Sequence, residues 1–305
     1  GPHLPEGSPI LVQLSHPLAL VTLLPALWSL GHIPILLESS FPADAWRRNG
    51  RSGFDALLRD SPLASGSPIE LAHLPPLRME LIPGPHRSAL PPGTVLVRTT
   101  SGTTGRPRGV ALSTPQLLAD ARNILSSLRL RPSATRSLGA VPMSHAYGFS
   151  TLLTPLLCFR IPLTLLESPL PEHFRAALRG SPSLFFPGVP LLFDLLLSSN
   201  LSTRLLGRLK PAISAGAPLP PRIALRFAEK TGVPLRNFYG SSECGAIACD
   251  ASEHGDFVGG CVGRPLQGVR VSVGARPGRS GGPPDRGDHR RTPWRPDWPQ
   301  AGTRG

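Results

Sequence analysis

The segment from Thr99 to Gly109 gathers glycines, hydroxyl side chains and two arginines, Arg106 and Arg108, in one short stretch. Glycine lets a backbone approach a ligand closely, and successive N–H groups in such a turn form a concavity that binds anions. The hydroxyl groups add hydrogen-bond donors, and the arginines add positive charge. The segment therefore predicts a cradle for a polyphosphate, with an ordinary surface loop as the alternative. It is not a Walker A loop, because the G-x-x-x-x-G-K-[ST] pattern is absent from the sequence.

A second stretch, from Tyr239 to Gly245, carries an aromatic ring, a hydroxyl and a carboxylate in close succession. The ring of Tyr239 can stack on a base, and the hydroxyl of Ser242 can hydrogen-bond a phosphate. Mg²⁺ prefers hard oxygen ligands and phosphates, so Glu243 is the candidate metal ligand. The alternative for Glu243 is a solvated carboxylate in a loop.

Two further loops follow expected strands. The first contains His145, Tyr147 and Gly148, and loops at the carboxyl ends of parallel strands are where α/β proteins bind ligands. We expect the imidazole and the phenol to border a pocket, the alternative being a structural histidine and a core tyrosine. The second contains Gly216 and Ala217, whose small size would let a planar ring lie against the backbone. A simple tight turn before a helix would explain the second loop equally well.

Alternating apolar strands and helical patterns must position these stretches. Strands are expected at 10–14, 33–37, 95–97, 137–141, 161–166, 184–186, 211–213 and 233–238, and helices at 18–30, 115–128, 148–158, 171–178, 189–197 and 221–231. The region 39–94 is weakly patterned, with a helix expected within 43–58 and a strand at 79–82. Alternation of this kind favours parallel sheets, so we predict an α/β fold with two mostly parallel sheets and packed helices.

The composition bounds the partners of this chain. Its 305 residues, 40% of them hydrophobic, are enough for one or two domains, and the net charge is +13. All basic residues except Lys210 and Lys230 are arginines, and they are scattered along the chain outside its tail. A nucleic-acid binder would gather them on one element, so no nucleic-acid partner is expected.

The cysteines and the apolar segments indicate the compartment. Cys244, Cys249, His254 and Cys261 lie close in sequence, but their spacing matches no standard zinc pattern. Free thiols in a reducing cytosol are therefore expected. The apolar stretch 18–30 is too short to cross a bilayer and no secretory signal is visible, so we expect a cytoplasmic protein without a transmembrane segment.

Several of these stretches, in order, resemble signatures of the adenylate-forming superfamily, which includes acyl-CoA synthetases, peptide-synthetase adenylation domains and luciferases. The first is Thr100 to Gly109, where the usual Pro-Lys-Gly ending has Arg108 at the lysine position. The positive charge is kept, although arginine and lysine differ in shape and hydration. The others are the His145 loop, the Gly-Ala-Pro-Leu segment at 216–219, the Tyr-Gly-x-Thr-Glu signature at 239–243 with Ser242 for threonine, and the glycine-rich turn from Gly259.

The resemblance implies a ligase of fatty acid metabolism that uses ATP and Mg²⁺ to convert a small carboxylic acid to acyl-AMP and pyrophosphate. The acyl group would then pass to CoA or to the thiol of an acyl carrier protein. Catalytic roles fall to His145 and Arg108, the metal to Glu243, and the acyl pocket to His145, Tyr147 and Gly148. The implied nucleotide contacts are Thr100, Ser101, Gly102, Thr103, Thr104, Gly105, Gly216, Ala217, Tyr239, Gly240 and Ser242.

The resemblance also suggests a division of the chain. Residues 1–98 would form a first α/β part that lacks its beginning, and residues 99–275 an AMP-binding part that ends at the start of a small β-barrel. Residues 276–305, rich in Gly, Pro and Arg, predict a disordered and perhaps frameshifted tail. The family's C-terminal domain with its catalytic lysine is not recognisable. An inactive nucleotide-binding module and a non-functional truncated product are therefore alternatives to an active enzyme.

Overall fold

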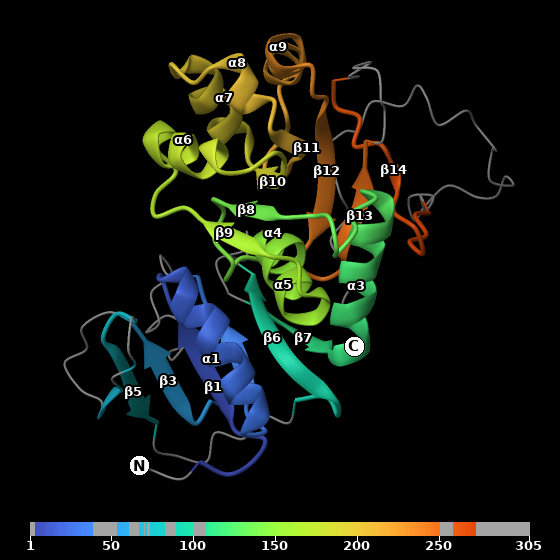
Figure 1. Cartoon of the computed structure of the whole chain (residues 1–305). Coiled ribbons are helices and arrows are strands. Elements are labelled where there is room, and N and C mark those ends of the chain that lie inside the picture. Colours follow the sequence, from blue (N-terminus) through green and yellow to red (C-terminus); the bar gives the residue numbers. More distant parts are fainter. Residues whose placement is uncertain are drawn as a thin grey trace, which may run out of the picture.

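The computed structural model describes residues 4–38, 54–60, 67–69, 71, 74–82, 90–100, 108–250 and 259–272. These residues form two seven-stranded sheets with packed helices, as the sequence predicts, and Figure 1 shows the first sheet, in blue to teal, below the second. The expected tail at 276–305 lies outside the described residues. The proposed division into three parts stays a prediction.

The first sheet has the strand order β4-β5-β3-β1-β2-β6-β7. Its strands are β1 (Pro9–Gln13), β2 (Ile33–Leu36), β3 (Ala56–Arg59), β4 (Ser67–Ile69), β5 (Leu77–Leu81), β6 (Thr94–Thr100) and β7 (Arg108–Ser113). The four central strands β3, β1, β2 and β6 run parallel, whereas β4, β5 and β7 pair antiparallel at the edges. The sheet is therefore mixed, with a parallel centre.

One predicted helix is wrong in the part that the structure describes. Residues 56–58, the end of the helix expected within 43–58, belong to β3 and are at most 2% exposed. This strand lies between β1 and β5 and is buried. A short apolar run buried on both faces shows no alternation, so its pattern does not distinguish a strand from a helix.

The strand β7 was not expected either. The sequence predicts a strand, a glycine-rich segment and then a helix, but β7 intervenes and pairs with β6, with Thr100 opposite Arg108. The segment 101–107 therefore connects two antiparallel strands. The following helix α3 (Thr114–Ser127) begins one residue before the predicted 115–128. Ser113 caps it, and the Ser113 N–H donates to Gln116 Oε1 at 2.8 Å.

The second sheet has the order β14-β13-β12-β11-β10-β8-β9. Its strands are β8 (Ser137–Gly139), β9 (Leu163–Leu165), β10 (Leu184–Gly188), β11 (Leu209–Ser214), β12 (Leu235–Ser241), β13 (Gly245–Cys249) and β14 (Arg264–Pro265). The strands from β9 to β12 are parallel, and β13 and β14 add antiparallel pairs. Instead of opening a barrel, the two residues of β14 extend this sheet, and residues 266–272 contain no strand.

Helices cover both sheets and join them. They are α1 (Pro17–Ser29), α3, the run α4 (Ala146–Gly148), η1 (Phe149–Leu153) and α5 (Thr154–Phe159), then α6 (Pro171–Arg179), α7 (Pro190–Ser198), α8 (Thr203–Leu206) and α9 (Pro221–Thr231). Figure 1 shows α4 and α5 between the two sheets. Phe149, Leu152 and Leu153 of η1 are buried in one core with Ile10 and Val12 of β1. The run 146–159 therefore ties the first sheet to the second.

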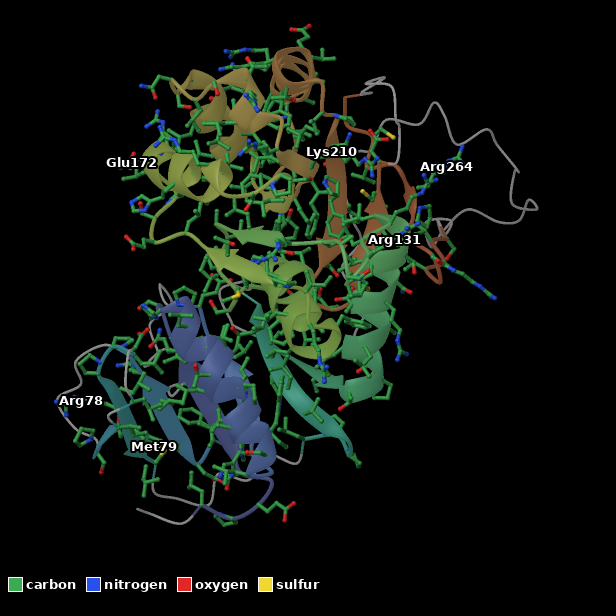
Figure 2. The ribbon with its side chains drawn as sticks, viewed as in Figure 1. Arg78, Met79, Arg131, Glu172, Lys210 and Arg264 are labelled. Atoms are coloured by element: carbon green, nitrogen blue, oxygen red, sulfur yellow. The ribbon has the colours of Figure 1, made fainter. Side chains whose placement is uncertain are left out.

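A chain of four aromatic rings organises the core of the second sheet. Phe174, Phe186, Phe193 and Phe227 contact one another in sequence, with ring centroids 5.2–5.4 Å apart and edge-to-face geometry. All four side chains are fully buried. The exposed charged side chains Arg131, Glu172, Lys210 and Arg264 lie on the outside of the molecule (Figure 2).

No helix in the described part of the chain is long and apolar enough to cross a membrane.

Replacing Phe193 by Ala should lower the free energy of unfolding by about 3–5 kcal/mol, because it leaves a cavity that the neighbouring rings only partly close. The control is Leu191→Ala on the same helix, where a side chain 77% exposed makes a change within about 0.5 kcal/mol the expected result. Urea unfolding measures both. Similar losses in the two variants would contradict this account of the core.

Candidate functional site

A cavity of about 220 Å³ opens where the second sheet meets the helical run that follows β8. From the second sheet it is lined by Ala215, Gly216, Phe238, Gly240, Ser241, Ser242, Gly245 and Ala246. From the helical run it is lined by His145, Ala146, Tyr147 and Ser150. The loops that follow β8, β11 and β12 therefore meet here, at the carboxyl edge of parallel strands where α/β proteins bind ligands.

The predicted site residues are partly brought together. His145, Tyr147, Gly216, Gly240 and Ser242 line the cavity. Four others, Ala217, Tyr239, Glu243 and Gly148, do not line it. Thr100 and Arg108 are the paired ends of β6 and β7, and Ser101, Gly102, Thr103, Thr104 and Gly105 lie outside the described residues.

The wall formed by β11 ends in a backbone that passes close to β10. Ala215 N–H donates to Gly188 O at 3.2 Å, and Gly216 then adopts a φ of +82°. This left-handed conformation favours glycine. Gly216 and Ala217 are exposed, and Gly216 lines the cavity. That a planar ring lies against this backbone stays a prediction.

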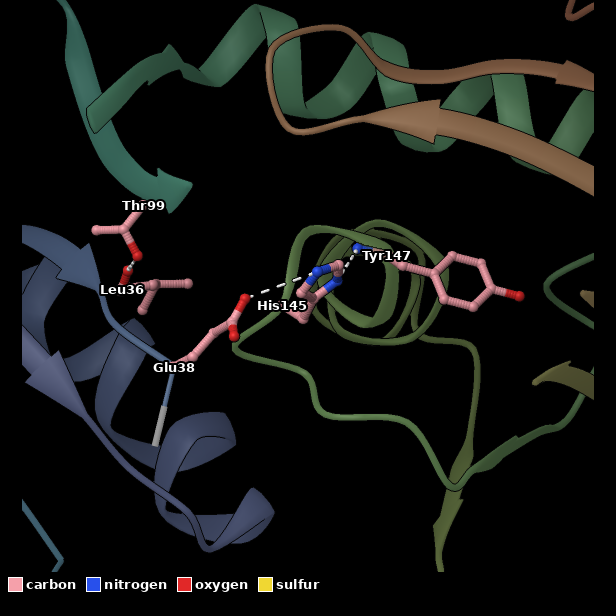
Figure 3. Close-up of polar contacts among 5 residues, drawn as sticks. All are labelled: Leu36, Glu38, Thr99, His145 and Tyr147. Atoms are coloured by element: carbon pink, nitrogen blue, oxygen red, sulfur yellow. Dashed lines mark hydrogen bonds and ion pairs between the residues drawn. The ribbon is translucent and has the colours of Figure 1, made fainter. Parts of the chain in front are cut away.

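His145 is held at the start of the helical run. Its Nδ1 accepts a hydrogen bond from the Tyr147 N–H at 3.3 Å, so a neutral ring carries its hydrogen on Nε2. That nitrogen lies 3.7 Å from Glu38 Oε1, just beyond β2 (Figure 3). The side chain of His145 is 49% exposed, and Nε2, beside the carboxylate of Glu38, is its nitrogen not engaged by the Tyr147 backbone.

Tyr147 turns its hydroxyl away from the cavity. The phenol donates towards Gly188 O at 3.2 Å and Ile213 O at 3.4 Å, the carbonyls of two adjacent strands. Its ring packs against Phe238, with centroids 5.8 Å apart. Burial, and to a smaller extent the neighbouring Cys249, raise the pKa of Tyr147 well above the ordinary 10.0. The ring therefore forms wall and core at once, and both alternatives considered for this tyrosine hold in part.

The turn between β12 and β13 carries the candidate metal and phosphate ligands. Phe238 points into the molecule and Tyr239 is 40% exposed, in the alternation of a strand. Ser242 lines the cavity, and Glu243 stands exposed beside it. No group of three His, Cys, Asp or Glu side chains that could hold a metal occurs within the described ranges. A single exposed carboxylate fits Mg²⁺, which is usually bound through one or two carboxylates and the substrate's phosphates.

Behind this turn lies a polar cluster that the sequence patterns do not predict, formed by half-buried Asp120 with buried Ser150 and Arg98. Asp120 of α3 accepts hydrogen bonds from the Ser150 hydroxyl at 2.5 Å and from the Ala246 N–H at 2.8 Å. Ser150 in turn accepts a hydrogen bond from Arg98 Nη2 at 3.2 Å. One signal was available: Arg98 follows the apolar run 95–97, and a charge within a buried strand needs compensating partners.

This chain matches a known protein family over most of its length. The model of the family of AMP-binding enzymes matches residues 4–286. The chain belongs to the AMP-binding enzyme family. The match covers nearly the whole described structure and includes both sheets.

Individual relatives of this AMP-binding protein are CoA ligases. It is 30% identical over 169 residues to the long-chain-fatty-acid–CoA ligase of Bacillus subtilis (strain 168), covering 54% of this chain and 29% of that protein. It is 32% identical over 187 residues to the probable 2-succinylbenzoate–CoA ligase of Mycobacterium tuberculosis (strain CDC 1551 / Oshkosh), covering 58% and 44%. The chain therefore spans less than half the length of these relatives.

Solved structures share the fold of this AMP-binding protein. O-succinylbenzoate coenzyme A synthetase (MenE) from Bacillus subtilis, in complex with AMP, superposes with a TM-score of 0.72 over 92% of this chain and 73% of that one, at 20% identity. ATP-bound MatB from Rhodopseudomonas palustris gives a TM-score of 0.68 over 86% and 55%, at 21% identity.

The cysteines of this AMP-binding protein are free thiols, as expected. Cys249 is buried, and burial raises the pKa of its thiol to about 12, with Arg236 opposing the shift. Cys244 and Cys261 are exposed, and His254 lies outside the described residues.

Replacing Tyr147 by Phe should lower the free energy of unfolding by about 1 kcal/mol near neutral pH, because one buried hydrogen bond is lost. The folded-state pKa is raised above 10.0, so the unfolded chain releases this proton first as the pH rises. The contribution of the phenol is complete below pH 10.0 and is lost as the pH rises through the folded-state pKa.

Urea unfolding of both proteins from about pH 8 to about pH 11 tests this expectation. The difference between them should shrink above pH 10.0. Parallel curves over the whole range would show that burial does not shift the phenol.

Proposed function

We propose that this chain is the nucleotide-binding part of a ligase that activates a small carboxylic acid with MgATP. The products are acyl-AMP and pyrophosphate, and the acyl group then passes to the thiol of CoA or of a carrier protein. The observation that carries the proposal is the cavity at the ends of β11 and β12, where Gly216, Gly240 and Ser242 face His145 and Ser150. Membership of the AMP-binding family supports the nucleotide.

In this reaction the protein has to position the reactants and stabilise the charge on the phosphates, and no covalent bond to the protein is needed. A carboxylate oxygen attacks the α-phosphorus, a new P–O bond forms, and the bond to the β-phosphate oxygen breaks as pyrophosphate leaves. Ser242 would hydrogen-bond the α-phosphate, and Nε2 of His145 would orient the carboxylate. Mg²⁺, held by Glu243, would supply charge neutralisation for the phosphates. Arg108 and the segment 100–105 would hold the β- and γ-phosphates.

The relatives support the class of substrate. The two relatives described above are named as CoA ligases of a long-chain fatty acid and of 2-succinylbenzoate. A carboxylic acid is common to them, whereas the rest of the acid differs. We therefore assign this chain a carboxylic acid substrate. A cytoplasmic location and a role in fatty acid metabolism accord with this assignment.

MgATP should raise the unfolding temperature of the full chain, with about 2.7 kcal/mol of stabilisation when its concentration is a hundred times the Kd. Glu243→Gln should reduce carboxylate-dependent pyrophosphate release by roughly a hundredfold or more, because charge stabilisation at the phosphates is lost. Cys244→Ser is the matched control, since Cys244 is the exposed neighbour in the same turn and does not line the cavity. Pyrophosphate release over a panel of carboxylic acids measures the effect.

Other outcomes of these two measurements distinguish the alternatives to an active enzyme. Stabilisation by MgATP without pyrophosphate release for any acid would indicate an inactive nucleotide-binding module. No stabilisation by MgATP would contradict the proposal and favour a non-functional product. Equal activities for wild type and Glu243→Gln would remove the metal role from this carboxylate.

A further inference from the structure

We propose that Arg98, Ser150 and Asp120 form a positioning relay. It fixes strand β6, which carries Arg98, relative to the turn that carries Ser242 and Glu243. The inference deepens the proposed function and rests on it, because the turn that the relay holds belongs to the proposed nucleotide site.

The contacts of the relay are continuous. Arg98 Nη2 donates to Ser150 Oγ at 3.2 Å, and the Ser150 hydroxyl donates to Asp120 Oδ2 at 2.5 Å. The second oxygen of Asp120 accepts the Ala246 N–H at 2.8 Å. One serine hydroxyl thus connects a guanidinium to a carboxylate. The guanidinium only donates, the carboxylate only accepts, and the hydroxyl does both.

The relay links four elements that are far apart in sequence. Arg98 lies in β6, Asp120 in α3, Ser150 in η1 and Ala246 in β13. Its first member is two residues before Thr100, where the segment 101–107 begins. Its last contact is three residues after Glu243. Ser150 and Ala246 also line the cavity, so a displacement within the relay would move a wall of the site.

The guanidinium end of the relay and Ser150 are buried, and Asp120 is half-buried. Arg98 is 3% exposed, and its guanidinium lies 4.6 Å from the centroid of the Phe149 ring. Burial lowers the pKa of Arg98 to about 10, and the charge of Asp120 opposes the shift. Within the described structure Arg98 Nε has no hydrogen-bond partner. The guanidinium is therefore compensated by its hydrogen bond to Ser150, by the charge of Asp120 and by the face of the Phe149 ring.

The turn is shaped to receive the carboxylate. Gly245 has a φ of +72°, and a Cβ atom there would lie 2.5 Å from Asp120 Oδ1. Any side chain would displace the carboxylate or the turn, so the absence of one at Gly245 lets α3 close directly behind Ser241 and Ser242. This fit gives the relay a rigid end at the cavity.

A contribution to stability alone does not explain why the charges of Arg98 and Asp120 are kept inside this part of the fold. Replacing a buried ion pair by neutral residues is often neutral or stabilising, whereas removing one partner is strongly destabilising. A charged relay between two binding segments can instead serve to fix their relative position. The two roles differ in what happens when both charges are removed together.

The first test compares two buried hydroxyls of the same helical run. Ser150→Ala breaks the relay, and we expect it to raise the Kd for MgATP roughly ten- to hundredfold, the effect of losing hydrogen bonds to charged groups. Thr154→Val is the matched control. Thr154 is 4% exposed like Ser150, but its hydroxyl bonds Phe149 O within the helical run and does not touch Asp120. The control should keep the wild-type Kd.

The second test separates position from stability. Arg98→Met and Asp120→Asn should each lower the unfolding temperature, because the first leaves the half-buried carboxylate and the second the buried guanidinium without its partner. The double variant should recover the unfolding temperature, since both charges are gone. It should still bind MgATP about tenfold or more weakly, because β6 is no longer linked to Ser150. Hydrogen exchange at the Ala246 amide reports the contact with Asp120 directly.

The results discriminate between the two proposals. If wild type and Ser150→Ala bind MgATP equally well, the relay is overturned and the proposed function stays intact. A double variant with both wild-type unfolding temperature and wild-type Kd would overturn it in the same way. Wild type that does not bind MgATP would overturn the proposed function itself, and the positioning role with it.

Discussion

The helical run that begins at Ala146 packs against both sheets, and the candidate site depends on this packing. Phe149 and Leu152 are buried with the strands of the first sheet. Tyr147, at the other end of the same turn, reaches the carbonyls of β10 and β11 in the second sheet. Because the run contacts both sheets through buried groups, it is held between them, and the cavity lies where this run meets the second sheet.

Polar contacts set the finer geometry at this junction. Thr99 Oγ1 donates to Leu36 O at 2.9 Å, and Glu38 lies beside His145 (Figure 3). The end of β6 is thereby held next to β2 and close to the loop of His145. On the other side, Asp120 holds Ala246. The strand that enters the segment 101–107 and the turn at 241–245 are thus connected through protein rather than across solvent, as a site shared between them requires.

Local chemistry explains which elements could be predicted. The helices at 171–179, 190–198 and 221–231 have Pro in their first turn and an amphipathic or apolar pattern, and each was expected within a residue or two. The strand at 56–59 was not, because burial on both faces removes the alternation that marks a strand. The strand β7 was not expected because its first residues, Arg108 and Gly109, belong to the glycine-rich motif, and pairing with β6 is a tertiary event.

The sequence by itself determined the residue types of the site and their order: a hydroxyl- and glycine-rich segment, an imidazole loop, a small-residue turn and a carboxylate turn, each after a strand. It did so because glycine, hydroxyl and charge requirements are local. Only the tertiary structure decided that the Tyr147 hydroxyl faces the core, that Tyr239 stays outside the cavity lining, and that Arg98, Asp120 and Ser150 meet behind it. Those outcomes depend on which buried groups must satisfy one another across the fold, and residues 52 positions apart, such as Arg98 and Ser150, become partners only when the sheets are assembled.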